Sequence, residues 1–205
     1  MSASTTILAS MPSRRTAMAL TTAIMLGFSV NVTTVEAAPC PAGAVAERAG
    51  NALVKAARTK SPSAFASALR KHADMRSIAL FALGKHRKKL PKAQEGTYVK
   101  LTSSYVSKTL ASFSKKFRAS SVETVRCRGK TVEGKLNQLG GRPPQKVIFR
   151  IKRGKVSDVN VQNVWLAQLL RSNFSSVIKK GGNKMSALFT HLGAGASVVA
   201  KLDVR

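Results

Sequence analysis

The sequence predicts an α+β fold in which helices pack on one face of a curved, four-stranded antiparallel sheet. Three observations lead to this class: helical periodicity over residues 44–117, four alternating runs between residues 121 and 161, and helical periodicity again from residue 165. Helices that are grouped before and after a meander of strands gather on one side of the sheet. Long helices over a curved sheet leave a cone-shaped interior, and the residues expected to face it are nearly all aliphatic or aromatic.

Several helical segments precede the strands. The first covers residues 44–58. Ser61 before Pro62 marks the start of a second, and a third runs from a cap at Asp74 to a stop at Gly84. The longest follows the basic linker "KHRKKLP", and its apolar face carries Tyr98, Leu101, Tyr105, Phe113 and Phe117.

The four alternating runs are residues 121–129, 130–139, 145–154 and 155–161. Tight turns, among them "GGRPP", separate them and indicate antiparallel hairpins. In the third run, Val147, Phe149 and Ile151 face one way, while three basic residues face the other. We therefore expect one apolar and one basic face of the sheet.

The stretch "VSDVNVQNVWLAQLLRSNF" changes from the two-residue period of a strand to the period of a helix. The only Trp, Trp165, stands at this change. We expect the helix to end at Gly181-Gly182 and a short last helix to cover residues 184–192. Residues 193–205 carry no firm signal and are expected to be a flexible tail.

Residues 1–37 are predicted to be a cleaved secretory signal. Arg14 and Arg15 precede the apolar run "AMALTTAIMLGFSVNV", and Val35 and Ala37 fit the −3 and −1 sites of cleavage. A retained anchor is the alternative, although the run is marginal in length for a membrane span. We expect export to the periplasm and one domain over residues 38–192, because the 168 residues of the mature chain, 38–205, suffice for one core and are unlikely to form two.

The formal net charge is +27, and +26 remains without the signal. Such a charge favours anionic partners. In an envelope compartment these include anionic membrane surfaces, where each basic residue contributes about 1 kcal/mol. Aromatic residues are not interleaved with basic ones as in a stacking platform, so nucleic acid is not the expected partner. A merely solvated basic surface remains the alternative.

The two cysteines, Cys40 and Cys127, both lie beyond the predicted signal. In an exported protein they can form a disulfide, which would tie the start of the mature chain to a strand. Two free thiols are the alternative.

Residues 154–192 resemble the C-terminal signature of the Mla-type periplasmic lipid carriers, the MlaC-like or toluene-tolerance auxiliary family. The segment "ALFALGKHRKKL" resembles the Leu-Gly element of the family, with His86 in place of an aromatic residue before Arg87. Many relatives carry Gly-Val-Ser where Asn163, Val164 and Trp165 stand here, which leaves the pocket rim and the lipid preference open. The matching signature positions are Asp158, Val159, Arg171, Phe174, Gly182 and Leu188.

The resemblance implies a nuclear-transport-factor-like cone whose apolar cavity takes phospholipid acyl chains and leaves the headgroup at the mouth. It also implies partners: an outer-membrane lipoprotein complex, and an inner-membrane ABC transporter with its substrate-binding ring. Some relatives are associated with hopanoid-type lipids. This implies a carrier that shuttles lipid between the two membranes.

The expected pocket wall combines the apolar face of the sheet with the long helix. Each residue in it is equally compatible with an ordinary core. Lys85 and Arg87 are candidates for contact with a lipid phosphate, whereas Arg171 falls off the apolar face of its helix. The predicted wall residues are Tyr105, Phe113, Val125, Leu136, Val147, Phe149, Ile151, Val159, Val161 and Trp165.

Catalysis, a metal site and a cofactor are not predicted. Enzymes with a cone-shaped interior need a carboxylate or a His–Asp pair inside it. Asp158 should point away from the pocket, because it alternates with Val159, and we expect it to form an ion pair. The three histidines show no metal-ligand spacing. The alternative to a lipid carrier is an exported cationic protein that binds lipopolysaccharide or nucleic acid at its surface.

Overall fold

The computed structural model describes residues 40–114, 116 and 118–194. They belong to the second of two units of the chain, residues 38–205. The described helices are α1 (Pro41–Thr59), α2 (Pro62–His72), α3 (Met75–Leu83), the 3-10 helices η1 (Gly84–Lys89) and η2 (Lys92–Gln94), α4 (Glu95–Phe113), α5 (Leu166–Lys180) and α6 (Met185–Ala194). The strands are β1 (Ala119–Arg128), β2 (Thr131–Gln138), β3 (Gln145–Lys152), β4 (Lys155–Val161) and β5 (Val164–Trp165). The predicted signal and residues 195–205 of the predicted tail lie outside the described residues, whereas residues 193 and 194 belong to α6.

The strands form one antiparallel sheet in the order β1-β2-β3-β4-β5. This confirms the predicted α+β class and meander and adds a fifth strand of two residues. β5 follows β4 through a two-residue turn at Gln162 and Asn163, whose φ angles are 51° and 65°. Positive φ at both central residues is the type I′ geometry of tight hairpins. The turn decides on which face of the sheet Trp165 lies.

The two faces of the sheet differ as the alternation of β3 predicted. On the inner face, Phe149 lies between Val132 on β2 and Val159 on β4. On the outer face, the basic residues of β3, Lys146 and Arg150 among them, are exposed. At β3 the sheet therefore needs cover on one side only, whereas Asp158 and Asn160 on the outer face of β4 are also buried.

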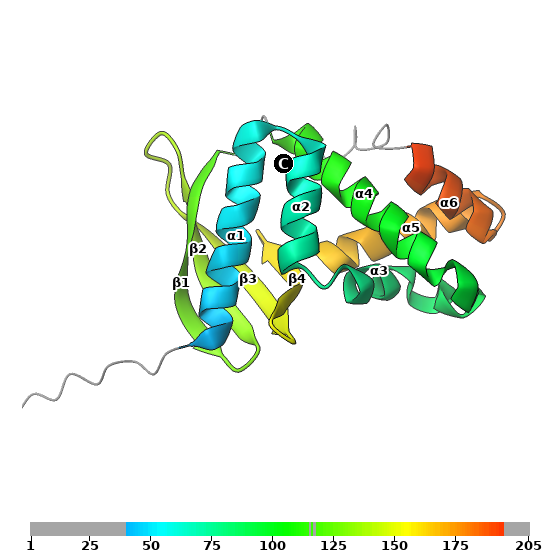
Figure 1. Ribbon diagram of the computed structural model, residues 1–205, viewed down its shortest axis with the longest axis horizontal. Helices are drawn as coiled ribbons and strands as arrows, with labels where there is room; N and C mark the ends of the chain where they lie inside the picture. The colour runs from blue at the N-terminus through cyan, green and yellow to red at the C-terminus, as the bar shows by residue number, and fades with distance from the viewer. Residues whose placement is uncertain (1–39, 115, 117, 195–205) are drawn as a thin grey trace, which may run out of the picture. The chain divides into compact units, whose positions relative to one another are not determined.

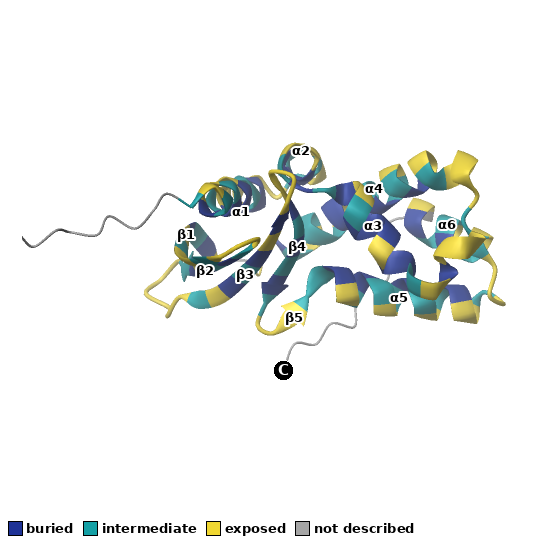
Figure 2. Cartoon of the chain, turned by 90° about the horizontal axis from the view of Figure 1, so that it is seen from below, coloured by how far each residue is buried: buried dark blue, intermediate teal, exposed yellow. Residues whose placement is uncertain are grey.

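The helices supply that cover. α1 contacts β1 to β4, α2 lies beside α1, and α4 lies beside α2 (Figure 1). At the β4 end of the sheet, α5 packs on α3 and α6, and α4 packs on α3 and α6 from another side (Figure 2). The inner face is thus enclosed by α1, α2 and the C-terminal part of α4.

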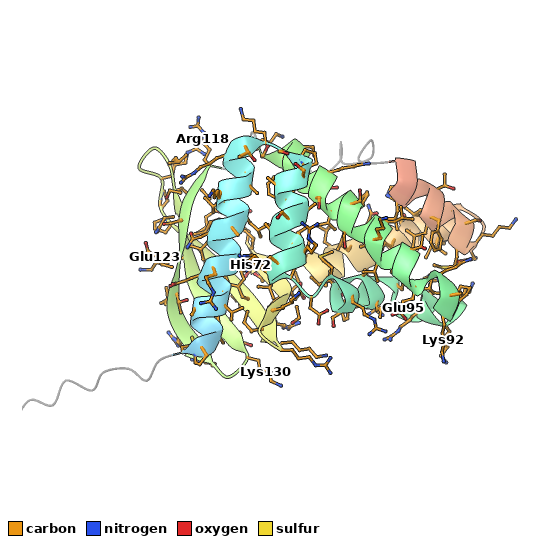
Figure 3. All side chains as sticks on the ribbon, viewed as in Figure 1. His72, Lys92, Glu95, Arg118, Glu123 and Lys130 are labelled. Atoms are coloured by element: carbon orange, nitrogen blue, oxygen red, sulfur yellow. A yellow bond between two sulfur atoms is a disulfide. The ribbon has the colours of Figure 1, made fainter. Side chains whose placement is uncertain are left out.

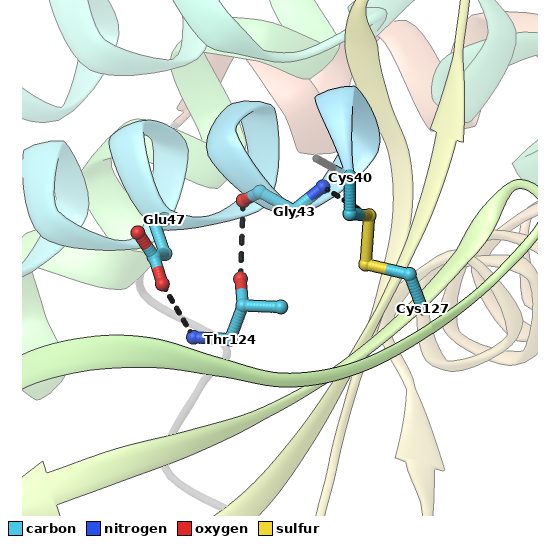
Figure 4. The surroundings of a disulfide bond; sticks show 5 residues. All are labelled: Cys40, Gly43, Glu47, Thr124 and Cys127. Carbon is cyan, nitrogen blue, oxygen red and sulfur yellow. Dashed lines mark hydrogen bonds between the residues drawn. A yellow bond between two sulfur atoms is a disulfide. The ribbon is translucent and has the colours of Figure 1, made fainter. Parts of the chain in front are cut away.

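Side chains of α1 bond to the free backbone edge of β1. The amide of Asn51 donates to the carbonyl of Val122 (3.1 Å) and accepts from its N–H (2.8 Å). The carboxylate of Glu47 accepts from the N–H of Thr124 at 2.6 Å (Figure 4). An unpaired strand edge invites association with another chain. α1 therefore covers this edge as well as the face of the sheet.

A disulfide joins Cys40, the N-cap residue of α1, to Cys127 near the end of β1 (Figure 4). The hydroxyl of Thr124 donates to the carbonyl of Gly43 nearby, at 3.2 Å. The bridged residues are 87 positions apart in sequence. The start of α1 is thus fixed to the sheet both covalently and by hydrogen bonds.

The buried residues form three clusters. The first fills the space between α3, α4, α5 and α6 and includes Tyr98, Tyr105 and Phe174. The second lies between α1 and the sheet. The third and smallest, around Phe65, lies where α1 and α2 meet α4. The candidate site lies between the second and third clusters.

Candidate functional site

An apolar cavity of about 150 Å³ lies between the inner face of the sheet and the three helices α1, α2 and α4. The lining residues from the described part of the chain are all apolar or glycine, so the cavity offers no hydrogen bond from a side chain. A space of this kind favours hydrocarbon over water. The lining residues are Gly50, Leu53, Phe65, Leu110, Phe113, Val122, Leu136, Val147, Phe149, Val159 and Val161.

Small and large apolar residues line the cavity from both the sheet and the helices. The sheet contributes valines in adjacent strands: Val147 on β3 lies directly opposite Val161 on β4. Gly50 lets α1 approach β1, because a Cβ at this position would lie 2.7 Å from Cγ2 of Val122. The helices contribute larger groups, Phe65 and Phe113 among them.

Six of the ten predicted wall residues line this cavity: Phe113, Leu136, Val147, Phe149, Val159 and Val161. The five that lie on β2, β3 and β4 are the residues that the two-residue alternation of these strands places on the inner face. Ile151 shares that face and is buried, but it packs in the cluster between α1 and the sheet and is not among the cavity residues.

Tyr105 lies elsewhere, in the helical core. Its ring is 5.9 Å from that of Phe174 and 5.2 Å from that of His191. Burial raises the pKa of the Tyr105 phenol. The same face of α4 serves two cores, because its first turns pack on α3 and α6 and only its last turns reach the cavity.

Val125 and Trp165 lie outside the cavity for reasons of register. A β-bulge between Thr124 and Arg126 makes Val125 the extra residue of β1, and its side chain is 53% exposed. Trp165 lies opposite Asn160, on the outer face, and its ring lies 3.9 Å from the guanidinium of Arg150. The structure therefore places both predicted wall residues away from the cavity.

Lys85 and Arg87, the candidates for headgroup contact, are exposed residues of η1. This element contacts α3 and α5 and contributes none of the cavity residues. Lys85 instead borders a polar hollow of about 490 Å³ with His86, Ser175 and Lys179. Burial, followed by the charges of Lys85 and Lys89, lowers the pKa of His86.

Sequence reasoning missed five lining residues: Gly50, Leu53, Phe65, Leu110 and Val122. The alternation of β1 indicates Val122, because this residue lies before the bulge and pairs with Leu136 on the inner face. The helical residues carried none that separates a cavity wall from an ordinary core, because both need an apolar helix face.

Asp158 points away from the cavity and forms the predicted ion pair. Its carboxylate lies 3.7 Å from Nη1 of Arg150 and accepts from the backbone N–H of Ala167 at 3.0 Å. The second bond satisfies a free N–H group in the first turn of α5. Asp158 therefore fixes the start of α5 on β4.

The other described acidic residues also have local partners. Glu47 bonds to β1, Asp74 caps α3, Glu95 pairs with Arg76, Glu123 accepts from Asn137, and Glu133 pairs with Lys146. No carboxylate or histidine lines the described part of the cavity.

Among the same described residues, His, Cys, Asp and Glu side chains do not gather in groups of three that could hold a metal ion. None of the described helices is long and apolar enough to cross a membrane.

A comparison with family models matches residues 48–194 to the MlaC protein model. The chain belongs to the MlaC family. Among solved structures, a phospholipid-binding protein from Ralstonia solanacearum, in complex with a phospholipid, has a similar fold, with a TM-score of 0.60 and 17% sequence identity. The similarity covers 75% of this chain and 95% of that one. A search of curated proteins gave no match.

Two segments on which the family resemblance rested lie together in the structure. The guanidinium of Arg171 on α5 lies over the ring of Phe81, 5.4 Å from its centroid. It also lies against Gly84, where a Cβ would come within 2.5 Å of Nε of Arg171 and where φ is +53°. Gly84 is therefore required by its backbone conformation, and Arg171 joins α5 to the end of α3.

Proposed function

We propose that the protein is a periplasmic carrier that holds the acyl chains of a phospholipid in the apolar cavity. In this proposal it shuttles lipid between an outer-membrane lipoprotein complex and an inner-membrane ABC transporter with its substrate-binding ring. The observation that supports it most is a cavity on the inner face of the sheet whose lining, among the described residues, is apolar throughout. Membership of the MlaC family and the similar fold of a phospholipid-binding protein agree with it.

The energetics of hydrocarbon suit such a carrier. Enclosing an acyl chain is worth about 0.8 kcal/mol per CH₂, so two chains of about fifteen methylenes would favour the protein over water by roughly 24 kcal/mol before other costs. Release into water is correspondingly slow. Loading and unloading then require contact with a partner or membrane that offers an equally dry path.

The cavity must widen to hold a two-chain lipid. Its volume of about 150 Å³ is below the range of roughly 300–1,000 Å³ that is typical of ligand pockets. The cavity lies between two separate hydrophobic clusters, so the helices can part from the sheet along the boundary between these clusters. We therefore expect one of the three covering helices to move outward when lipid enters.

A transfer assay tests the proposal. Donor vesicles carry a self-quenched fluorescent phosphatidylglycerol, and acceptor vesicles are held behind a membrane that passes only protein. A carrier makes acceptor fluorescence rise in proportion to its concentration. Fluorescence that stays at the protein-free level contradicts the proposal.

The alternative, a cationic surface binder of lipopolysaccharide or nucleic acid, predicts a different pattern. Binding through surface charge weakens steeply with salt, because it depends on displaced counterions. Acyl chains inside an apolar cavity remain bound in high salt. Measuring retained lipid after a high-salt wash therefore separates the two functions.

A further inference from the structure

A second hollow, a groove of about 680 Å³, lies between α2, α3 and α4. Small side chains line much of it, among them Ala66 on α2 and Ser103 and Ser104 on α4. Its charged lining residues are Arg70, Arg76, Lys100, Lys108 and Lys155, with Asp74 as the one acidic residue among those described. We refer to it as the basic groove.

Most of the positive charge of the basic groove is uncompensated. Among the described residues, Arg70, Lys100 and Lys108 have no acidic partner in ion-pair distance, whereas Arg76 pairs with Glu95. The Asp74 carboxylate is engaged by the N–H and the hydroxyl of Ser77, at 3.0 and 2.7 Å.

The electrostatic potential at His72, at the C-terminal end of α2, is also positive. Burial, followed by the charges of Lys71, Arg48 and Lys155, lowers the pKa of His72. The groove thus presents a positive potential that the described part of the chain does not neutralise.

α2 separates the basic groove from the apolar cavity. Phe65 lines the cavity, and the next residue, Ala66, lines the groove. α2 packs mainly on α1 and α4, in the smallest of the three hydrophobic clusters. An occupant of the groove would therefore touch the reverse side of a cavity wall.

α2 is also the least anchored of the three covering helices. α1 is fixed to β1 by the disulfide and by the bonds of Glu47 and Asn51. α4 is fixed by Tyr98, which is buried and donates to the carbonyl of Ala79 at 2.8 Å. Between α2 and either helical neighbour, no side-chain hydrogen bond occurs in the described part of the chain. Its C-terminal end is tied to β4, where Lys155 donates to the carbonyl of Arg70 at 3.2 Å and the N–H of Asp74 donates to the carbonyl of Val156 at 2.8 Å. The N-terminal half of α2, which carries Phe65 and Ala66, is consequently the part of the wall that can move at the lowest cost.

We propose that the basic groove is the docking site for an acidic segment of a partner protein, and that its occupation displaces α2 and opens the cavity. The first part of the proposal, docking, depends on the charge and shape of the groove. The second part, opening of the cavity, rests on the proposed lipid-carrying function; we call these parts the docking half and the opening half.

The shape of the groove favours a protein segment over a bilayer surface. A bilayer is flat on this scale and can meet the rim of a concave site but not its interior. A protruding acidic helix or loop can enter, and the small side chains allow its backbone to come close. Charge complementarity of this kind sets specificity and association rate.

Docking is tested with a short, Glu-rich, fluorescein-labelled helical peptide and two charge-reversal variants. The first is Arg70→Glu/Lys100→Glu/Lys108→Glu in the groove. The matched control is Lys130→Glu/Lys135→Glu/Arg142→Glu, which changes the net charge equally at exposed positions on β2 and its flanking turns. Figure 3 shows Lys130 at the turn between β1 and β2.

We expect the groove variant to bind the peptide about tenfold more weakly than wild type, and the control to differ much less. Equal weakening in both variants means that only net charge attracts the peptide, which overturns the proposal. The same variants are mixed with phosphatidylglycerol/phosphatidylcholine vesicles. Groove-dependent vesicle binding without groove-dependent peptide binding assigns the groove to a bilayer and also overturns it.

Displacement of α2 is measured by electron paramagnetic resonance with pairs of spin labels. One pair is Ser67→Cys on α2 with Arg142→Cys in the β2–β3 turn, and the reference pair is Lys55→Cys on α1 with Arg142→Cys; all three positions are exposed. Added peptide should change the first distance and leave the second unchanged. Peptide binding with no change in either distance overturns the opening half. Absence of co-purified lipid would instead contradict the proposed function, while the docking result would stand.

Discussion

Filling the cavity should stabilise the protein and exclude lipid at the same time, and the variant Val161→Phe tests this. Val161 lines the cavity from β4, and Phe is well tolerated in strands. In a close-packed core the same enlargement would cost about 1–3 kcal/mol. The sign of the stability change therefore distinguishes a cavity from a core.

The magnitude follows from the volume. At about 24 cal/mol per Å³, complete filling of 150 Å³ would stabilise by at most about 3.6 kcal/mol. A phenyl ring in place of an isopropyl group fills roughly a third of that space, so we expect a gain of about 1 kcal/mol. For a chain of this size that gain raises Tm by about 2–4 °C.

The assay compares delipidated proteins by calorimetry and, separately, the phospholipid that co-purifies with each protein. Val125→Phe is the control, because Val125 is 53% exposed and lies outside the cavity. We expect a higher Tm and little bound lipid for Val161→Phe, and a lipid content like that of wild type for the control. A lower Tm, or an unchanged lipid content in Val161→Phe, would refute the reasoning.

Three further predictions concern stability. Replacing Cys40 and Cys127 by Ser should lower the free energy of unfolding in urea by about 2–4 kcal/mol, because the bridge closes a loop across 87 positions; equal stability of both proteins would contradict this. Gly84→Ala should destabilise the protein by about 1–3 kcal/mol, because the φ of Gly84 is +53° and a Cβ there meets Arg171. Gly96→Ala, which adds a Cβ in open space on α4, should instead stabilise it by about 0.5–1 kcal/mol. Shifts of the same sign in the thermal melts of both variants would contradict this. Burial, followed by the charges of Lys85 and Lys89, lowers the pKa of His86 below 6.5, so the folded state binds fewer protons than the unfolded state. The contribution of His86 to the free energy of unfolding should therefore be complete above pH 6.5 and fall on acidification, and the fall should be smaller in His86→Gln. Identical pH profiles of unfolding in the two proteins would contradict this.

The sheet and its inner face could be predicted because strands have a short, strict period. Once "GGRPP" placed a turn before β3, the alternation of Val147 and Phe149 with basic residues fixed the face on which both lie. The same alternation placed Val159 and Val161 opposite them on β4. Most of the lining that the strands contribute follows from this parity.

The misplaced residues depend on local changes of register. Val125 stands two residues before Cys127, so strict alternation would place both side chains on the same face of β1. The bulge between Thr124 and Arg126 breaks this alternation. The turn before β5 has Gln162 and Asn163 at positive φ without a glycine, so it carries no strong hairpin signature. Trp165 therefore lies on a strand that the sequence did not indicate.

The helical side of the cavity depends on packing between segments that are far apart in sequence. Leu53, Phe65 and Leu110 come from three helices and meet only in the fold. An apolar helix face looks the same in sequence whether it meets a core or a cavity. Tyr105 shows the converse, since it shares a face with Phe113 but packs beside Phe174.

Native mass spectrometry of residues 38–205, purified from the periplasm without detergent, tests the presence of lipid in the cavity most directly. We predict a species heavier than the polypeptide by one phospholipid per chain, which persists after a high-salt wash and is lost in Val161→Phe. A spectrum with the mass of the bare polypeptide alone would contradict the assignment of the cavity to acyl chains.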